Sequence, residues 1–305
     1  MPAIPIKNSG ALYALAAYST WGFVPLFWRE LRMFSPTQIL AHRILWSLVF
    51  FICIFAFRKS LITWLSELWN GTTLKRSLLS SVAIGLNWGL YIYAVNSGHA
   101  LESSLGYFIN PIFNILIGAV FFKEQLNRLQ WTAFATAFIG VSWLTIVNGQ
   151  MPWVALSLAT TFSAYGVIRK KTAIKGTTGT AAESLILVPI AIAILSSHTI
   201  APVSLADLHA PLKPALLLIL GGAVTALPLV WFSEAAQRMP LSTLGFFQYI
   251  SPTFQFLIAV FIFKENFNTT IFSAYLIIWI GLAIFIFDSA RNHFQERREP
   301  SSTST

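Results

Sequence analysis

The feature that most constrains this chain is a series of long apolar stretches joined by short connectors. A helix that crosses the hydrocarbon core of a bilayer needs about 20 mostly apolar residues. Of the 305 residues, 56% are hydrophobic and 10% are charged, whereas soluble domains contain roughly 25% charged residues. We therefore predict an all-α integral membrane protein with ten transmembrane helices, at residues 11–28, 38–57, 77–97, 103–122, 129–147, 152–168, 182–197, 214–236, 241–263 and 270–288.

The positive charges are distributed unevenly between the two sides of the predicted membrane. With the N-terminus inside, the inner loops and termini hold 15 Lys and Arg residues, and the outer loops hold 4. Lys and Arg in short loops are retained on the cytoplasmic side. This asymmetry predicts that both termini are cytoplasmic. It also explains the net charge of +9 better than nucleic-acid binding by a basic soluble surface would.

The two ends of the chain and its single cysteine limit how the protein is processed. Lys7 precedes the first apolar stretch, as in a signal peptide, but cleavage would leave an uneven set of helices, so we expect the stretch to be retained. Residues 290–305 are polar and predict a disordered cytoplasmic tail. Cys53 is the only cysteine, which excludes an intramolecular disulfide and a metal site built from cysteines.

An internal duplication organises the sequence. Eight residues within a window of 17 recur 141 positions later: Pro111, Phe113, Leu116, Ile117, Phe122, Lys123, Glu124 and Asn127 match Pro252, Phe254, Leu257, Ile258, Phe263, Lys264, Glu265 and Asn268. Each copy holds five predicted helices, and an odd number gives the second copy the opposite orientation in the membrane. Inverted repeats are typical of secondary transporters. We assign residues 1–148 to the first half and 149–289 to the second.

Four segments of the chain resemble a known family. They are residues 101–111 (LESSLGYFINP), residues 241–250 (LSTLGFFQYI), the pair His42-Arg43, and the stretch from Asn87-Trp88 to Asn96. Together they are similar to the RarD branch of the EamA-type drug/metabolite transporters, and the resemblance covers all ten predicted spans. It implies two EamA repeats, a bacterial inner-membrane location, and transport of small metabolites or drugs such as chloramphenicol or amino-acid-like solutes.

Two prolines mark the predicted solute site. Pro111 and Pro252 lie near the middle of their predicted spans, where a proline removes a backbone hydrogen bond and bends the helix. Transporters place solute sites at such breaks. The alternative is a membrane proline with no part in binding. The polar residues that flank them are Asn110, Asn114, Gln248, Tyr249 and Gln255. We therefore predict that the two prolines, with Asn110, Gln248 and Tyr249 next to them, form a midplane site.

Charged groups inside the apolar stretches are the next candidates. Arg43 lies within the second span, where a charge is costly unless it has a partner or faces water, so it predicts anion recognition or a gate together with His42. The alternative is an arginine that extends to the membrane interface. Glu183 and Glu234 lie near cytoplasmic span ends and could carry a coupling proton. The alternatives are solvation at the interface or pairing with Lys175 and Arg238.

The third predicted span carries polar and aromatic groups. Asn87, Trp88 and Tyr91 are spaced so that Asn87 and Tyr91 share one helical face. With Tyr107 and Tyr165 they predict a cavity for an amphipathic or aromatic solute, although hydrogen bonding between helices is the alternative for each residue. The outer-loop histidines have no metal-ligand spacing, and we predict that they are solvated: His99, His198 and His209.

The sequence therefore predicts a secondary transporter that alternates access around a midplane cavity. No Walker-type phosphate loop, HExxH zinc motif or GxSxG elbow is found, so we expect no ATP hydrolysis, metal or cofactor. The expected partners are a small-molecule substrate, the lipid bilayer and a coupling proton. Two alternatives remain open at this point: a membrane enzyme that acts on lipid-linked substrates, and a membrane scaffold without transport activity.

Overall fold

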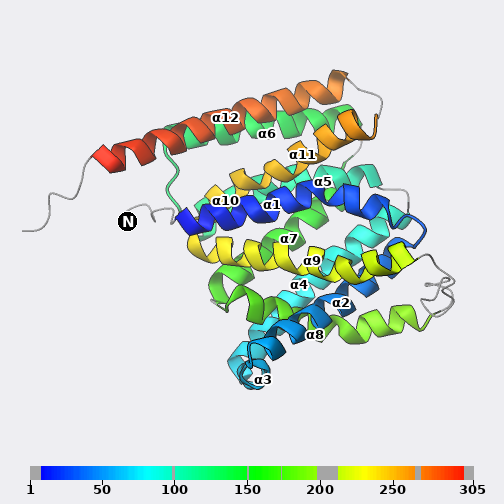
Figure 1. Ribbon diagram of the computed structural model, residues 1–305. Coiled ribbons are helices and arrows are strands. Elements are labelled where there is room, and N and C mark those ends of the chain that lie inside the picture. Colours follow the sequence, from blue (N-terminus) through cyan, green and yellow to red (C-terminus); the bar gives the residue numbers. More distant parts are fainter. Residues whose placement is uncertain are drawn as a thin grey trace, which may run out of the picture.

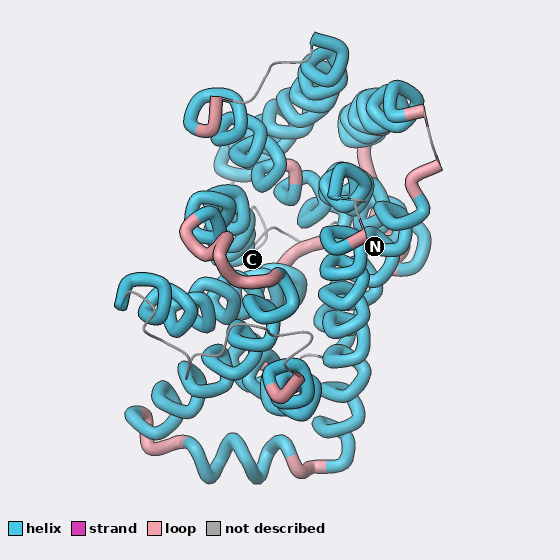
Figure 2. The backbone as a smooth tube through the Cα atoms, turned by 90° about the vertical axis from the view of Figure 1, so that its right-hand side faces the viewer, coloured by secondary structure: helices cyan, strands magenta, loops and turns pink. Residues whose placement is uncertain are grey.

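A computed structural model describes residues 8–97, 100–149, 151–172, 174–197, 212–264 and 269–298, and these residues form a bundle of helices without β-strands (Figures 1 and 2). The elements in chain order are α1 (Asn8–Arg29), α2 (Pro36–Phe57), α3 (Leu61–Leu68), α4 (Gly71–Asn96), α5 (Ala100–Phe121), α6 (Arg128–Asn148), α7 (Trp153–Thr172), α8 (Gly176–Leu195), α9 (Leu212–Arg238), α10 (Leu241–Gln248), α11 (Ile250–Leu257), the π-helical turn η1 (Ile258–Ile262) and α12 (Thr269–Arg298). The short α3, between α2 and α4, was not predicted.

Seven helices of the described part are long and apolar enough to cross a membrane, judged by length and composition: Pro36–Phe57, Gly71–Ala94, Arg128–Val147, Gly176–Leu195, Leu212–Arg238, Leu241–Ile262 and Phe272–Arg291. A shorter apolar helix covers Leu105–Phe121. The protein is thus a multi-pass membrane protein, and the count of ten spans stays a prediction. α1 and α7 do not meet the criterion, and both contribute to the polar interior described below, where a less apolar helix is tolerated.

Local sequence signals fix several helix ends. Ser35 caps α2 in a reciprocal capping box with Gln38, and Pro36 occupies the first position of that helix, where its missing N–H is no loss. Asn127 and Gln130 make the equivalent box at the start of α6. These caps satisfy backbone N–H groups that have no partner within the helix.

The helices pack in pairs that join the two halves of the chain. α6 lies against α12, which together form one edge of the bundle in Figure 1, α2 against α8, and α5 against α10. α1 packs on α9 and α11, whereas α7 packs on α4 and α5. The main core cluster lies between these layers and contains apolar side chains from both halves.

The backbone passes the two duplicated prolines in different ways. α5 is a single helix that continues through Pro111 without interruption. In the second half the helix is interrupted at Tyr249, between α10 and α11, and Pro252 is the third residue of α11. A proline in the first turn loses no intrahelical hydrogen bond, which explains why the break precedes it.

The duplication is visible in local geometry as well as in sequence. Lys123 and Lys264 both adopt the left-handed conformation, with φ angles of 52° and 57°. The residue before each lysine closes the same turn, since the Phe122 N–H donates to Ile117 (3.3 Å) and the Phe263 N–H to Ile258 (2.9 Å). Identical residues therefore end both helices in the same way.

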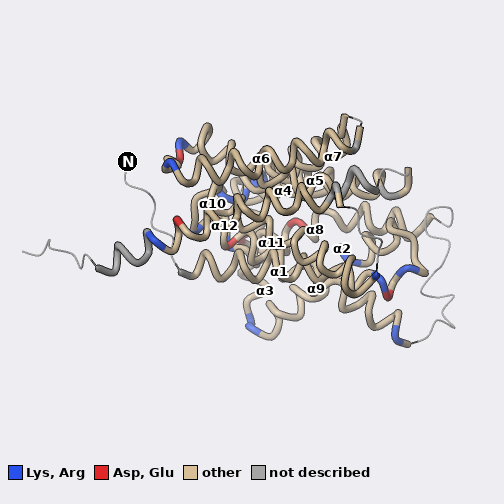
Figure 3. The backbone as a smooth tube through the Cα atoms, turned by 90° about the horizontal axis from the view of Figure 1, so that it is seen from above, with Lys and Arg blue, Asp and Glu red and all other residues tan. Residues whose placement is uncertain are grey.

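Lys and Arg residues lie mostly at the two ends of the bundle, leaving its middle nearly free of charge (Figure 3). The start of α1 and the end of α12 lie at the same end (Figure 1). α12 continues to Arg298, so the described part of the tail predicted to be disordered is helical. The predicted outer-loop histidines and the repeat residues Glu265 and Asn268 lie outside the described residues.

Candidate functional site

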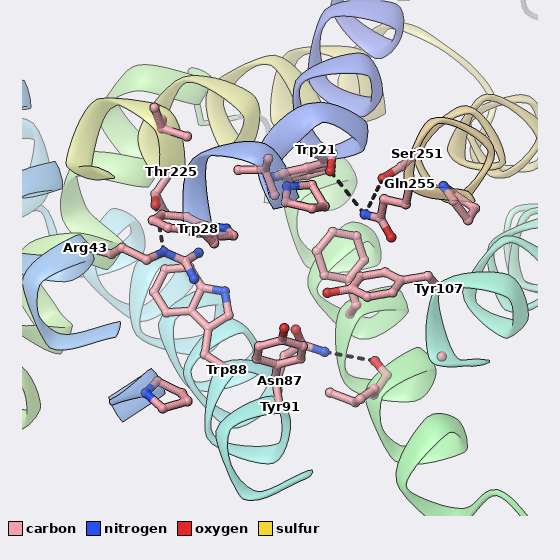
Figure 4. A pocket seen from close by; sticks show the side chains of 18 of the residues that line it. Trp21, Trp28, Arg43, Asn87, Trp88, Tyr91, Tyr107, Thr225, Ser251 and Gln255 are labelled. Atoms are coloured by element: carbon pink, nitrogen blue, oxygen red, sulfur yellow. Dashed lines mark hydrogen bonds between the residues drawn. The ribbon is translucent and has the colours of Figure 1, made fainter. Parts of the chain in front are cut away.

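A pocket of about 700 Å³ lies within the bundle (Figure 4). Side chains from α1, α2, α4, α5, α7, α9, α10 and α11 line it. The lining begins at the exposed Arg29 and Arg32, at the end of α1 opposite the N-terminus, and reaches the buried Asn110 and Gln248. The pocket thus extends from one end of the bundle into its interior.

Helical periodicity brings the lining residues of each helix onto one face. On α1 the lining aromatics include Tyr18, Trp21 and Trp28, which are spaced three and seven apart. On α4, Asn87 and Tyr91 are four apart and face the pocket together with neighbouring side chains. A stripe at this spacing is enough to turn one side of a helix toward a cavity.

Arg43 on α2 is the charged group of the pocket interior. Its Nε donates a hydrogen bond of 2.8 Å to the hydroxyl of Thr225 on α9. Its guanidinium carbon lies 5.0 Å from the ring centre of Trp28 and 5.4 Å from that of Trp88, so the cation lies between two indoles (Figure 4). Among the described residues, Arg43 has no carboxylate partner.

Amide side chains form the inner wall of the pocket. Asn114 Nδ2 donates to Gln248 Oε1 at 2.8 Å and to Asn110 Oδ1 at 3.4 Å, which links α5 to α10. Ser163 of α7 also donates to Asn110 Oδ1, at 2.9 Å. On α11, Gln255 donates to the Trp21 carbonyl at 3.1 Å. Polar contacts beside the pocket therefore link α5 to α7 and α10, and α11 to α1.

The mouth of the pocket is positively charged. The Arg29 guanidinium lies 4.8 Å from the ring centre of Phe263, and Arg32 donates to the Arg29 carbonyl. Glu30 pairs with Lys213 at 2.5 Å, and this partner lowers the pKa of the Glu30 carboxyl through its hydrogen bond and its charge. Arg29 and Arg32 also act on Glu30, so this single carboxylate is shared among three cations.

Eight of the twelve residues predicted for the solute site line this pocket: Arg43, Asn87, Trp88, Tyr91, Tyr107, Asn110, Gln248 and Pro252. They come from five different helices and from positions up to 209 residues apart, from 43 to 252. The fold thus gathers most of the predicted set around one cavity. Their role in binding a solute stays a prediction.

The other four predicted residues lie outside the lining. His42 is buried and precedes Arg43 by one residue, which places it about 100° away around α2. The Pro111 carbonyl oxygen faces Gly245 of α10. Tyr249 is 1% exposed and packs in a core cluster with residues of α5, α6 and α12. Tyr165 instead binds Glu183 through its hydroxyl, at 3.0 Å.

Sequence reasoning missed part of the lining. The aromatic residues Tyr18, Trp21, Trp28 and Phe162 line the pocket, as do the mouth arginines and the polar residues Thr225 and Ser251. For α1 a signal was available, since its aromatic residues share one helical face. For Thr225 there was none, because its link to Arg43 joins positions 182 residues apart.

A second buried polar cluster lies beside the pocket, between α7, α8 and α9. Arg169 is 1% exposed and its guanidinium lies 3.5 Å from the carboxylate of Glu183, which is 3% exposed. Arg169 also donates to Ser233 at 2.7 Å. The predicted partner of Glu183 was Lys175, so this pairing is a correction, whereas Glu234 does pair with Arg238 as the alternative expected.

The end of the bundle near the N-terminus is closed by a carboxylate at the start of α10. Glu124 accepts hydrogen bonds from the backbone N–H groups of Leu241 (2.7 Å) and Ser242 (2.8 Å) and from the Ser242 hydroxyl (2.7 Å). A negative charge at a helix N-terminus is favourable. Glycines allow the close crossing above it, since a Cβ on Gly245 would lie 2.8 Å from the Pro111 carbonyl oxygen.

Comparison with known proteins identifies the family. The sequence profile of the EamA-like transporter family matches residues 8–146. The chain is 41% identical over 292 residues to protein RarD of Salmonella typhimurium, covering 92% of this chain and 96% of that protein. This chain is a RarD-like member of the EamA-like transporter family. A relative in this family from Bacillus subtilis, the uncharacterized transporter YojE, is 39% identical and covers 93% of this chain and 95% of its own length.

Two further similarities extend the family comparison. The chloramphenicol-sensitive protein RarD of Pseudomonas aeruginosa is 31% identical over 293 residues, covering 94% of this chain and 96% of that protein. A crystal structure of a protein with 16% identity superposes with a TM-score of 0.68 over 91% of this chain and 97% of that one. At this identity the structural match speaks for the shared fold alone. This chain therefore shares its fold with a protein of low sequence identity.

Proposed function

We propose that this protein is a secondary transporter that moves a small solute by alternating access and without ATP hydrolysis. The observation that carries the proposal is the pocket of about 700 Å³, which reaches the surface at one end of the bundle and is backed by the α5–α10 crossing at the other. A cavity open to one side and blocked on the other corresponds to one state of an alternating-access cycle.

The helix packing supports an inverted two-fold arrangement of residues 1–148 and 149–289. If α1 and α7 are equivalent, and likewise α4 and α9, then the packing of α1 on α9 has its counterpart in the packing of α7 on α4. The pairs α2 with α8, α5 with α10 and α6 with α12 join equivalent elements. Two near-equivalent halves allow two packings that open to opposite sides.

The orientation follows from the loop charges. With 15 Lys and Arg residues on the N-terminal side and 4 on the other, both termini belong in the cytoplasm, and the relatives favour a bacterial inner membrane. The pocket mouth at Arg29 and Arg32 then faces outward. Glu124 and the start of α10 form the cytoplasmic closure.

A proton is our candidate for the coupling ion, and Glu183 is its candidate carrier. Glu183 is buried within a predicted span, where an ionisable group is expected to be functional. One of its oxygens accepts from Tyr165, and the other lies near Arg169 without a hydrogen-bond donor in the described part of the chain. Protonation would weaken its attraction to Arg169 and so could change the contact between α7 and α8.

Relatives named as transporters favour transport over the enzyme and scaffold alternatives. The name of the Pseudomonas relative adds chloramphenicol-type compounds to the candidate solutes, beside amino-acid-like metabolites. We therefore propose to measure uptake of chloramphenicol and of amino acids by the purified protein in liposomes, with and without an imposed pH gradient.

The decisive variants are Gln248→Leu and Asn114→Leu. Both remove the hydrogen bond between the two amides, but only Gln248 lines the pocket. We expect similar losses of thermal stability and a larger loss of apparent solute affinity in Q248L, about tenfold for each 1.4 kcal/mol of lost contact. Normal transport kinetics in Q248L would contradict the midplane site, and an absence of gradient-sensitive flux for every solute would contradict secondary transport.

A further inference from the structure

We infer that the solute is an organic anion, a carboxylate with a flat apolar body, whose carboxylate binds Arg43 between Trp28 and Trp88. This inference rests on the proposed transport function and names its substrate class. It is carried by three properties of the pocket: the sign of its charge, the unused hydrogen-bond donors of Arg43, Asn110 and Gln248, and its aromatic walls.

The charge of the pocket is positive throughout. The lining includes Arg43 in the interior and Arg29 and Arg32 at the mouth, and no Asp or Glu among the residues described. The nearest acidic group along the chain at the mouth, Glu30, is paired with Lys213. A cationic solute would meet like charges without a counter-ion, which costs free energy in a site of low dielectric constant.

Arg43 has hydrogen-bond donors that the protein does not use. Its Nε is used by Thr225, and within the described residues no protein group accepts from its two terminal amino groups. The guanidinium is planar, and a carboxylate is the acceptor that matches two of its parallel N–H groups. The flanking indoles of Trp28 and Trp88 stabilise the cation but accept no conventional hydrogen bond from it. A neutral solute would leave this half-buried cation without an ionic partner.

The amides of the inner wall also present donors. The side-chain oxygens of Asn110 and Gln248 accept from Ser163 and Asn114, so their NH₂ groups are the ends left for the pocket. The hydroxyl groups of Tyr91 and Tyr107 enter the same space (Figure 4). A solute rich in acceptor atoms satisfies this wall, and the cost of unpaired buried donors disfavours one that lacks them.

Aromatic side chains supply the apolar part of the site. Trp21 and Phe162 pack edge to face, with ring centres 5.8 Å apart, beside the amide wall. Such walls favour a flat ring system by stacking and by apolar burial. The exposed Arg29 and Arg32 would attract an anion toward the mouth, an effect that salt weakens.

The experiment compares three indole probes that differ in charge: indole-3-carboxylate, its primary amide, and an indolyl-methylammonium. Binding to the purified full-length protein is measured by isothermal titration calorimetry at low and high salt. We expect the carboxylate to bind at least about tenfold more tightly than the amide, the ammonium to bind most weakly, and the carboxylate affinity to fall with added salt. Equal or tighter binding of the amide or the ammonium overturns the inference, as does a failure of the carboxylate to bind at millimolar concentration.

Variants of Arg43 then test whether the preference for the carboxylate depends on this residue. Arg43→Gln is expected to bind carboxylate and amide with equal affinity, Arg43→Lys to keep part of the preference, and the control Arg58→Gln, at the opposite end of α2, to keep all of it. If R43Q does not fold, Thr225→Val tests the same site. It removes the hydrogen bond that holds the Arg43 Nε, so the guanidinium is less well positioned and the preference for the carboxylate should fall. An unchanged preference in R43Q, or in T225V when R43Q cannot be purified, overturns the assignment to Arg43.

Flux measurements separate the two proposals. If the carboxylate binds in an Arg43-dependent way but is not transported, the anion site stands and the transport function fails. If the neutral probe is transported in a Gln248-dependent way and the carboxylate is not preferred, transport stands and the anion site fails.

Discussion

α5 and the segment α10–α11–η1 derive from equivalent parts of the duplicated sequence, but they line the pocket over different lengths. In α5 the lining residues precede Pro111, namely Gly106, Tyr107 and Asn110. In the second half Gln248 and Ser251, 141 positions after Tyr107 and Asn110, line the pocket as well, and the lining continues through Pro252 to Gln255. The residues before the proline therefore face the pocket in both halves, and only the second half also contributes its proline and residues beyond it.

The spacing of the two motifs accounts for part of the difference. Gly106 precedes Pro111 by five residues, whereas Gly245 precedes Pro252 by seven. Two additional residues in an unbroken helix would rotate everything beyond them by about 200°. The interruption at Tyr249 and the wide turn of η1 are places where the second half can absorb such a change. Duplicated sequence therefore does not guarantee duplicated helix geometry.

The largest expected effect concerns the crossing of the two segments. Gly245→Ala would place a methyl group 2.8 Å from the Pro111 carbonyl oxygen, so we expect a loss of roughly 1–3 kcal/mol in the free energy of unfolding. Thermal unfolding in detergent measures it. The matched control is Gly89→Ala on α4, where nothing lies within 4 Å and alanine favours the helix. Equal melting temperatures of the two variants would mean that the crossing is looser than described.

A middle-sized effect is expected at the closed end. Glu124→Gln replaces one carboxylate oxygen, an acceptor for the start of α10, with a donor. Loss of this hydrogen bond should shift the equilibrium between the two packings about tenfold toward the one that opens to the cytoplasm. Hydrogen bonds to charged groups contribute about 1.5–3 kcal/mol. The measurement is the labelling rate of Ser251→Cys from the pocket mouth, in a Cys53→Ala background, which should fall.

The control for this labelling experiment is Glu67→Gln, which changes an exposed carboxylate on α3. It should leave the rate unchanged. Faster labelling in E124Q than in the parent would show that Glu124 does not hold the closed end.

The smallest effect separates the two prolines. Pro111→Ala restores an N–H inside α5 that can bond to the Tyr107 carbonyl, which should raise stability by about 1 kcal/mol. Pro252→Ala restores an N–H in the first turn of α11, where no intrahelical acceptor is in place, so its melting temperature should hardly change. Equal shifts in both variants would remove the distinction between the two helices.

The sequence by itself determined that the chain is a multi-pass helical membrane protein and which family it belongs to. Runs of about 20 apolar residues have few other stable forms, because every backbone polar group must be satisfied within the membrane. It also indicated Arg43 and the polar face of α4, since a polar or charged group inside an apolar helix is conspicuous along the chain. Eight predicted residues consequently line one pocket.

The tertiary structure alone decided which of those groups face each other. Spacing along one helix does not reveal contacts between helices. Examples are the pairing of Arg169 with Glu183, the hydrogen bond from Arg43 to Thr225, and the contact that turns Tyr165 away from the pocket. Each depends on which helices become neighbours and on how each is rotated about its axis. One residue of difference turns a side chain by about 100°, so His42 and Arg43, adjacent in sequence, have different surroundings.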